Sequence, residues 1–289
     1  MDQQSRQIMK KKVEALTDLP TLPIVVLKLN EMLRNPSTSA QDIGELLQQD
    51  LVISARTLKL VNSAYYGFPR KIASITRAIV ILGFQKVRDL ALTVSVMDIF
   101  NGRSDALFSP EAFWQHALTA AIATETIAGR LRSPEQKDAF MGGLLHDMGR
   151  FLLARNFSHD YAKAVRHMQE NGCPLVEAER AALGFDHGLV GEWLTEKWKF
   201  PSKLVRAIRY HHSPDVAKED TGYVYLVHAG DVIARAVDVG VEGANPISPF
   251  SRKVWKHFNI NRVKLDSIIR DVLGGLRTAQ DFFDLIPKR

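Results

Sequence analysis

Apolar side chains recur at every third or fourth position through most of the chain, and this spacing predicts α-helices. Residues 24–33 carry such a stripe behind Pro23, residues 40–47 repeat it, and residues 51–58 carry a third. Few stretches alternate between apolar and polar with a period of two, so the pattern does not require a β-sheet. The sequence therefore predicts an all-α fold.

The predicted helices have well-marked beginnings. Ser39 and Asp50 can each cap a first turn, because a short polar side chain accepts hydrogen bonds from the free N–H groups there. Ser109-Pro110-Glu111 combines a cap, a first-turn proline and a first-turn acid. Residues 133–136 (SPEQ) form a capping box, and the helix that follows is predicted to end at Gly149. Further starts are expected at Ser74, Pro174, Asp186 and Ser202, with Asp160 as the cap of a helix from Tyr161.

The polar residues 101–105 (NGRSD) are the best candidate for a boundary between two parts of the chain. We therefore expect an N-terminal helical subdomain over residues 1–105 and a second helical domain over residues 106–289. The predicted helical tail from Ser251 to Arg289 carries Ile268, Ile269, Val272 and Leu273 on an apolar stripe. This stripe can pack on its own domain or on a second copy of the chain.

Composition narrows the cellular context and the partners. A single cysteine, Cys173, excludes an internal disulfide framework and favours a reducing compartment. The longest apolar runs are too short to span a bilayer, and residues 1–12 are too polar for a signal peptide, so we expect a cytoplasmic protein without a membrane segment. The net charge of +6 comes from basic residues interleaved with acids. This scatter argues against nucleic-acid binding and suits a nucleotide-like anionic ligand.

Histidine is confined to one part of the chain. All nine histidines follow residue 115. Neutral imidazoles and ionised carboxylates supply lone pairs to divalent cations, and helical bundles often direct such side chains to one point. Five predicted helices carry candidates, and the metal ligands proposed from the sequence are His116, His146, Asp147, His187, His211, His212 and Asp231.

Asp231 is the most informative of these residues. It lies in a strongly apolar run, and on a helix its own face also carries Val224, Val227 and Ala234. An ionised carboxylate on such a face is costly unless a cation or several donors compensate it. A metal ion would provide that compensation.

Other polar residues have simpler interpretations. The second His-Asp dipeptide, His159-Asp160, follows polar residues and is expected to lie outside the site, as are His167 and His257. Asp186 is expected to act as a helix cap. His228 is three residues before Asp231, where packing in the core or an outer contact to the site both fit.

The order His, His-Asp, His, His-His, Asp resembles the HD superfamily of metal-dependent phosphohydrolases, and residues 142–150 (GGLLHDMGR) look like its central motif. Residues 19–23 (LPTLP), 62–67 (NSAYYG) and 78–83 (AIVILG) resemble the HDOD domain, the HD-related output domain of bacterial signalling proteins. The resemblance covers residues 19–237. It implies an all-helical HDOD fold and a regulatory role, although many members have lost the ligand set that this chain keeps.

Two functions follow from this combination. The resemblance implies a signal-transduction protein whose partners are other regulatory proteins. The retained ligands instead favour a phosphohydrolase or phosphodiesterase acting on a nucleotide-like phosphate ester. Seven ligands exceed the need of one ion, so Asp147 could bridge two divalent ions (iron, manganese or zinc) that activate water for attack on phosphorus. Arg150 could then steady phosphate oxygens, or it could be a surface charge at a helix end.

The cyclic-dinucleotide phosphodiesterases of the HD-GYP subgroup fit less well. Gly222-Tyr223 is followed by Val224 rather than proline, and the pair lies inside a predicted helix. The interval between His212 and Asp231 is also short for the loop of that subgroup. We therefore treat the Gly-Tyr pair as a coincidence.

Overall fold

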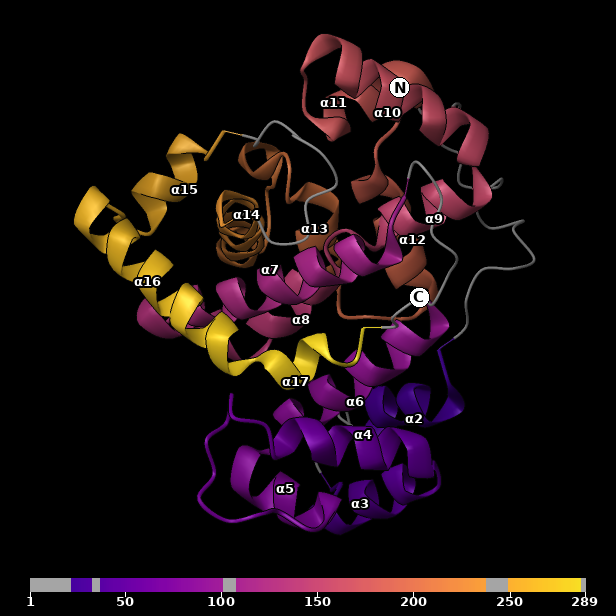
Figure 1. Ribbon diagram of the computed structural model, residues 1–289, viewed down its shortest axis with the longest axis vertical. Helices are drawn as coiled ribbons and strands as arrows, with labels where there is room; N and C mark the ends of the chain where they lie inside the picture. The colour runs from indigo at the N-terminus through magenta and orange to yellow at the C-terminus, as the bar shows by residue number, and fades with distance from the viewer. Residues whose placement is uncertain (1–21, 33–36, 101–107, 238–248, 287–289) are drawn as a thin grey trace. The chain divides into compact units, whose positions relative to one another are not determined.

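The computed structural model describes residues 22–32, 37–100, 108–237 and 249–286 (Figure 1). Within these ranges all regular structure is helical and no strand occurs, which confirms the all-α prediction. None of the described helices combines the length and the apolar character that crossing a membrane requires. The predicted boundary at residues 101–105 lies outside the described residues.

The chain folds as two compact units. Among the described residues, the small unit consists of residues 22–32, 37–100 and 273–286, and the large unit consists of residues 108–237 and 249–272. The C-terminal segment therefore groups with the first part of the sequence. The division into residues 1–105 and 106–289 rests on the polar sequence at residues 101–105 and stays a prediction.

The small unit is built from short amphipathic helices whose predicted caps are present. The Asp50 side chain accepts hydrogen bonds from the N–H groups of Val52 and Ile53, and Ser39 forms a capping box with Asp42. The buried Phe282 ring packs edge-on against Tyr65 at 5.5 Å between centroids. The helices of this unit are α2(Ile24–Met32), α3(Ala40–Gln48), α4(Leu51–Val61), α5(Ile75–Leu82), α6(Phe84–Ile99) and α17(Gln280–Phe283).

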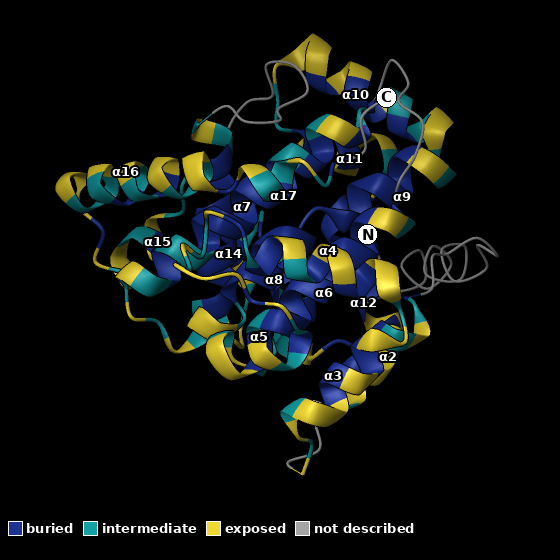
Figure 2. Ribbon diagram, turned by 60° about the horizontal axis from the view of Figure 1, so that its bottom comes forward, coloured by how far each residue is buried: buried dark blue, intermediate teal, exposed yellow. Residues whose placement is uncertain are grey.

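The large unit is organised around three helices that pack on one another: α7(Pro110–Arg130), α8(Ala139–Leu145) and α14(Thr221–Ala236). These are among the most deeply buried helices, as Figure 2 shows in dark blue. The others are η1(Pro134–Lys137), α9(Met148–Asn156), α10(Ser158–Asn171), α11(Leu175–Leu183), α12(His187–Lys197), α13(Ser202–Tyr210), η2(Pro214–Val216), α15(Arg252–His257) and the part of α16(Arg262–Thr278) up to Val272.

Glycines let the three central helices approach closely. A Cβ atom on Gly143 of α8 would lie 2.4 Å from the Ala120 carbonyl oxygen of α7. A Cβ atom on Gly230 of α14 would lie 1.9 Å from the Thr124 hydroxyl oxygen, also on α7. No larger residue fits these contacts without separating the helices. The result is that α8 and α14 both pack closely on the part of α7 that follows its buried His116.

Two predicted helix boundaries are wrong. The sequence 134–149 was expected to form one helix, but the structure has η1, then α8, then a turn at His146 and Asp147, with Gly149 inside α9. The helix expected from Tyr161 begins at Ser158, because the Tyr161 N–H already bonds to the Phe157 carbonyl. Asp160 is therefore a first-turn residue, and its carboxylate pairs with Lys163 at 2.8 Å.

The first part of α16 packs on its own chain. Ile268 and Val272 are buried, as their helical stripe predicts. Arg130 at the end of α7 donates hydrogen bonds to the Ser267 hydroxyl at 2.7 Å and to the Asp271 carboxylate. Ile268 and Val272 thus pack on their own chain, whereas Ile269 is half-buried and Leu273 is exposed. Packing of the stripe on a second copy stays a prediction.

Candidate metal centre

Three candidate ligands come together where α7, α8 and α14 meet. The Nε2 atom of His116 lies 3.2 Å from Nε2 of His146 and 3.1 Å from Oδ1 of Asp231. The His146 Nε2 atom lies 3.4 Å from the same carboxylate oxygen. All three residues are buried, and their ligand atoms form one compact group.

The other four candidates form a second group beside the first. Asp147 Oδ1 lies 3.2 Å from His187 Nε2 and 3.4 Å from His211 Nε2. His212 completes this group, and its Nδ1 atom is 3.6 Å from Asp231 Oδ2. Asp147 also reaches the first group, because its Oδ1 atom is 3.4 Å from His146 Nε2. Asp147 therefore lies where a carboxylate shared by both groups would be needed.

Each group is assembled by the local fold. His146 and Asp147 occupy the turn between α8 and α9, so their side chains leave the backbone in different directions. His187 follows the Asp186 cap, whose carboxylate accepts a hydrogen bond from the Leu189 N–H as predicted. His211 is the C-cap of α13 and His212 follows it.

Hydrogen bonds fix the orientation of three imidazoles. Nδ1 of His146 donates to the Gly143 carbonyl at 2.6 Å, and Nδ1 of His211 donates to the Ile208 carbonyl at 2.7 Å. Nδ1 of His187 donates to the Glu179 carboxylate at 2.6 Å. With the proton held at Nδ1, the Nε2 lone pair of each ring can face the centre, as a metal ligand requires.

These residues fit a metal ion. Asp147 Oδ1 and Asp231 Oδ2 are buried and accept no hydrogen bond from the described residues, which is costly for carboxylate oxygens without a cation. Ligands about 2.1 Å from a shared ion in tetrahedral directions lie about 3.4 Å apart, close to the separations found here.

The surrounding charges keep both carboxylates ionised. Burial alone would raise the pKa of Asp147, but His146 and His187 outweigh it and hold the pKa well below its usual range. Burial alone would also raise the pKa of Asp231, but Arg235 and the hydrogen bond from His116 outweigh burial and hold that pKa well below its usual range. The centre therefore presents two anionic oxygen donors at neutral pH.

Two arginines lie beside the carboxylates. Arg150 donates to Asp147 Oδ2 at 3.1 Å and is buried, so its interpretation as a surface charge is wrong. Arg235 donates to Asp231 Oδ1 at 2.8 Å and to Asp147 Oδ2 at 3.3 Å. Arg235 was not predicted from the sequence, although its position four residues after Asp231 on a helix is typical of an ion pair.

Glu179 was also missed. Its carboxylate accepts hydrogen bonds from both the ring and the backbone N–H of His187, and the residue is fully buried. Glu179 shares a face of α11 with Leu175 and Val176. Like Asp231, Glu179 is an acid on an apolar helical face, and this feature of the sequence could have identified it.

The remaining histidines lie outside the two groups. His159, His167 and His257 are exposed, as expected. His228 is buried and donates from Nδ1 to the His211 carbonyl at 2.7 Å, while its Nε2 accepts from the Ser251 N–H at 3.1 Å. His228 is therefore a core residue and also an outer contact to the site, because it holds the backbone of the candidate ligand His211.

Replacing Glu179 with glutamine should weaken metal binding about 10- to 100-fold, because a neutral amide holds the His187 ring less firmly and makes its Nε2 less basic. Competition with a metal chelator measures the affinity. Glu177→Gln, an exposed change on the same helix, should leave it unaltered. Equal affinities for both variants would show that Glu179 does not position His187.

Metal affinity should rise with pH. Burial would lower the pKa of His187, but Glu179 and Asp147 outweigh it and raise the pKa to about 10 in the metal-free protein. Between pH 6 and 9 this imidazole holds a proton that a metal must displace, so affinity should increase by up to about tenfold per pH unit. Calorimetry in buffers of different ionisation enthalpy counts the released protons. A pH-independent affinity would contradict the expectation.

Comparison with known proteins shows similarity over most of the chain. The HDOD domain family model matches residues 19–214. A curated relative, an uncharacterized protein of Treponema pallidum, is 23% identical over 249 residues, which cover 86% of this chain and 47% of the relative. The chain thus spans about half the length of that relative.

Two solved structures share the fold. An HDOD domain protein of Geobacter sulfurreducens superposes with a TM-score of 0.83 at 24% identity and full coverage of both chains. A candidate phosphohydrolase of Shewanella amazonensis SB2B gives a TM-score of 0.77 at 24% identity, with 98% of each chain covered. At these identities the structures show a common fold.

Proposed function

This chain belongs to the HDOD domain family. Because the chain carries seven buried or half-buried His and Asp donors in two groups, we propose that it is a metal-dependent phosphohydrolase in a signalling pathway. Its substrate class is a nucleotide-like phosphate ester. The observation that carries the proposal is the position of Asp147 between two groups of buried donors, with arginine side chains beside it.

The protein residues divide the work of such a site. His116, His146 and Asp231 would hold one ion, and His187, His211 and His212 the other, with Asp147 shared between them. Divalent ions bound there supply Lewis acidity and lower the pKa of a water molecule. Imidazole-rich donor sets suit iron, manganese and zinc.

The arginines suit the recognition of phosphate. A guanidinium group presents several N–H donors in one plane, which match phosphate oxygens in pairs. Arg150 and Arg235 now share Asp147 Oδ2 as an acceptor. A phosphate group bound at the centre would place its negative charge beside the guanidinium groups of Arg150 and Arg235, and its oxygens could accept hydrogen bonds from them.

The second candidate function is that of a non-catalytic regulatory module, in which the metal is structural or is the signal itself. The burial of the centre favours it, since the side chains of His146, Asp147 and Asp231 have no exposed surface. A buried centre restricts the approach of a phosphate ester. The partners in this case would be other signalling proteins.

Metal analysis together with a hydrolysis panel separates the two functions. Protein loaded in turn with manganese, iron or zinc should contain one or two ions per chain and should hydrolyse at least one phosphate monoester or cyclic nucleotide. Bound metal without turnover in all three forms would exclude hydrolysis of the tested esters and favour the regulatory module. Protein that binds no metal would contradict both functions.

A further inference from the structure

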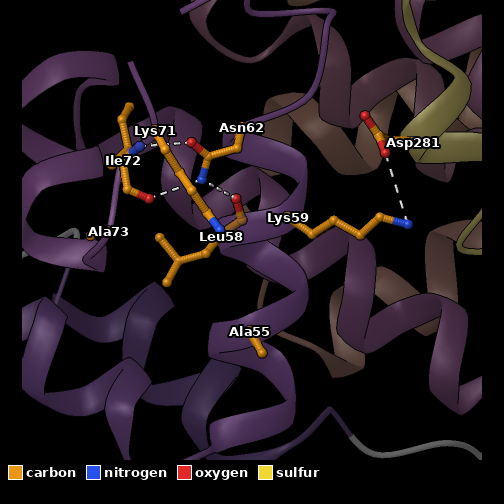
Figure 3. Close-up of a pocket in the computed structure, with 8 residues that line it drawn as sticks. All are labelled: Ala55, Leu58, Lys59, Asn62, Lys71, Ile72, Ala73 and Asp281. Carbon is orange, nitrogen blue, oxygen red and sulfur yellow. Dashed lines mark hydrogen bonds and ion pairs between the residues drawn. The ribbon is translucent and has the colours of Figure 1, made fainter.

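The small unit contains a pocket that is separate from the metal centre. Its cavity volume is about 550 Å³, which lies within the range of about 300–1,000 Å³ typical of small-molecule sites. The pocket lies between α4 and the segment 71–73, which we call the strap, and its lining includes Asp281 of α17 (Figure 3). All of its lining residues belong to the small unit.

The wall formed by the strap is held in place by one side chain. Oδ1 of Asn62 accepts a hydrogen bond from the Ile72 N–H at 2.7 Å, and Nδ2 of Asn62 donates to the Ile72 carbonyl at 2.9 Å. The same Nδ2 also donates to the Leu58 carbonyl at 2.8 Å, which ties the strap to α4. Because both polar groups of the Ile72 backbone are satisfied, the pocket is formed before any ligand arrives.

The pocket combines an apolar floor with a cationic rim. The Ile72 side chain is buried and Leu58 is half-buried, whereas Lys59 and Lys71 are exposed. Figure 3 shows the Lys71 side chain reaching from the strap toward α4 and the Lys59 side chain pointing to Asp281. The Lys59 ammonium lies 3.8 Å from the Asp281 carboxylate, while Lys71 has no ion-pair partner among the described residues. The two lysines and the one aspartate together give the rim a net positive charge.

We propose that this pocket binds a small organic anion of the phosphate monoester or phosphonate class. Its charged group would pair with Lys71 and compete with Asp281 for Lys59. Its apolar part would cover Leu58 and Ile72. Asn62 begins the NSAYYG sequence, so this stretch would shape a ligand site in the small unit. The inference is independent of the metal centre, whose residues all lie in the large unit.

An NMR titration of the full-length ¹⁵N-labelled protein tests the proposal. Phenylphosphonate is the probe, since it has an anionic group and an apolar ring and carries no ester to hydrolyse. We expect saturable shifts of the Ile72 and Ala73 amides and of the Asn62 side-chain amide. Benzyl alcohol and inorganic phosphate, which each carry one half of the probe, should bind more weakly. Shifts confined to residues around the metal centre would overturn this inference and leave the proposed function intact.

Charge changes at the rim give effects of opposite sign. Lys59→Gln and Lys71→Gln should each weaken phenylphosphonate binding about three- to tenfold, because each removes one charged partner. Asp281→Asn should strengthen binding by a similar factor, since it removes the carboxylate that competes for Lys59. Lys28→Gln, an exposed change on α2 outside the pocket, should have no effect. Affinity that is indifferent to Lys71→Gln, or that falls with Asp281→Asn, would overturn the assignment of an anion.

Discussion

Asp147→Asn is expected to reduce the metal affinity of the protein by more than about 100-fold and to abolish metal-dependent hydrolysis. Asparagine has nearly the same shape, but its amide has no ionised oxygen to share between the two groups of donors. Loss of an outer hydrogen-bonding partner already costs about 10- to 100-fold in metal affinity, and Asp147 faces both groups directly. Metal content after dialysis and turnover of the best ester from the hydrolysis panel are the measurements.

The chain offers a matched control for this change. Asp160 belongs to the second His-Asp dipeptide, and its carboxylate pairs with Lys163 at the surface. Asp160→Asn should therefore leave both metal content and turnover unchanged. Circular dichroism of each variant checks that the helical fold is kept. Full metal content in Asp147→Asn would show that Asp147 is not a ligand, whatever happens to turnover.

Gly149→Ala is expected to destabilise the protein by about 3 kcal/mol, at the upper end of the usual cost of overpacking. The added Cβ atom would lie 1.9 Å from the His187 carbonyl oxygen and 2.8 Å from the Gly191 nitrogen. Both are backbone atoms, so α9 and α12 must move apart. Thermal unfolding of the metal-free protein measures the effect, and a decrease of about 6–12 °C in Tm is expected.

The same change should also weaken metal binding, because Asp147 precedes α9 and His187 begins α12. Gly274→Ala is the control. Apart from its chain neighbours and its own helix backbone, no atom of the described residues lies within 4 Å of the position of its added Cβ, and alanine favours a helix by about 0.8–1 kcal/mol over glycine. Gly274→Ala should therefore raise Tm slightly. An unchanged Tm in Gly149→Ala would mean that α9 and α12 are packed less closely than described.

Some features of the site could be predicted because they depend on residue type and local spacing. The helical pattern placed His116, His187 and Asp231 on separate helices, and the cost of burying an isolated carboxylate drew attention to Asp231. Caps at Asp50, Ser109 and Asp186 were predicted because a cap acts within three residues of its own position. The structure brings all seven candidate ligands into two adjoining groups. Their role as ligands stays a prediction.

Other features required the tertiary structure. Gly149 was predicted to end a helix, but it lies inside α9, where the lack of a side chain lets the backbone of α12 approach. The neighbouring sequence does not distinguish these two uses of glycine. The support that Glu179 gives to His187 depends on how α11 lies against the start of α12. The pocket depends on Asn62 meeting the backbone ten residues later and on Asp281 from the far end of the chain.

The sequence by itself determined the all-α class, the family, most of the helix caps and the chemical character of the candidate metal centre. These follow from periodicity, side-chain chemistry and contacts between neighbours in the chain. Only the tertiary structure decided which backbones approach closely, how near Asp147 lies to the imidazoles of both donor groups and which arginines neutralise it. Such pairings join residues that are distant in sequence, and their energies depend on helix crossings that no local pattern records.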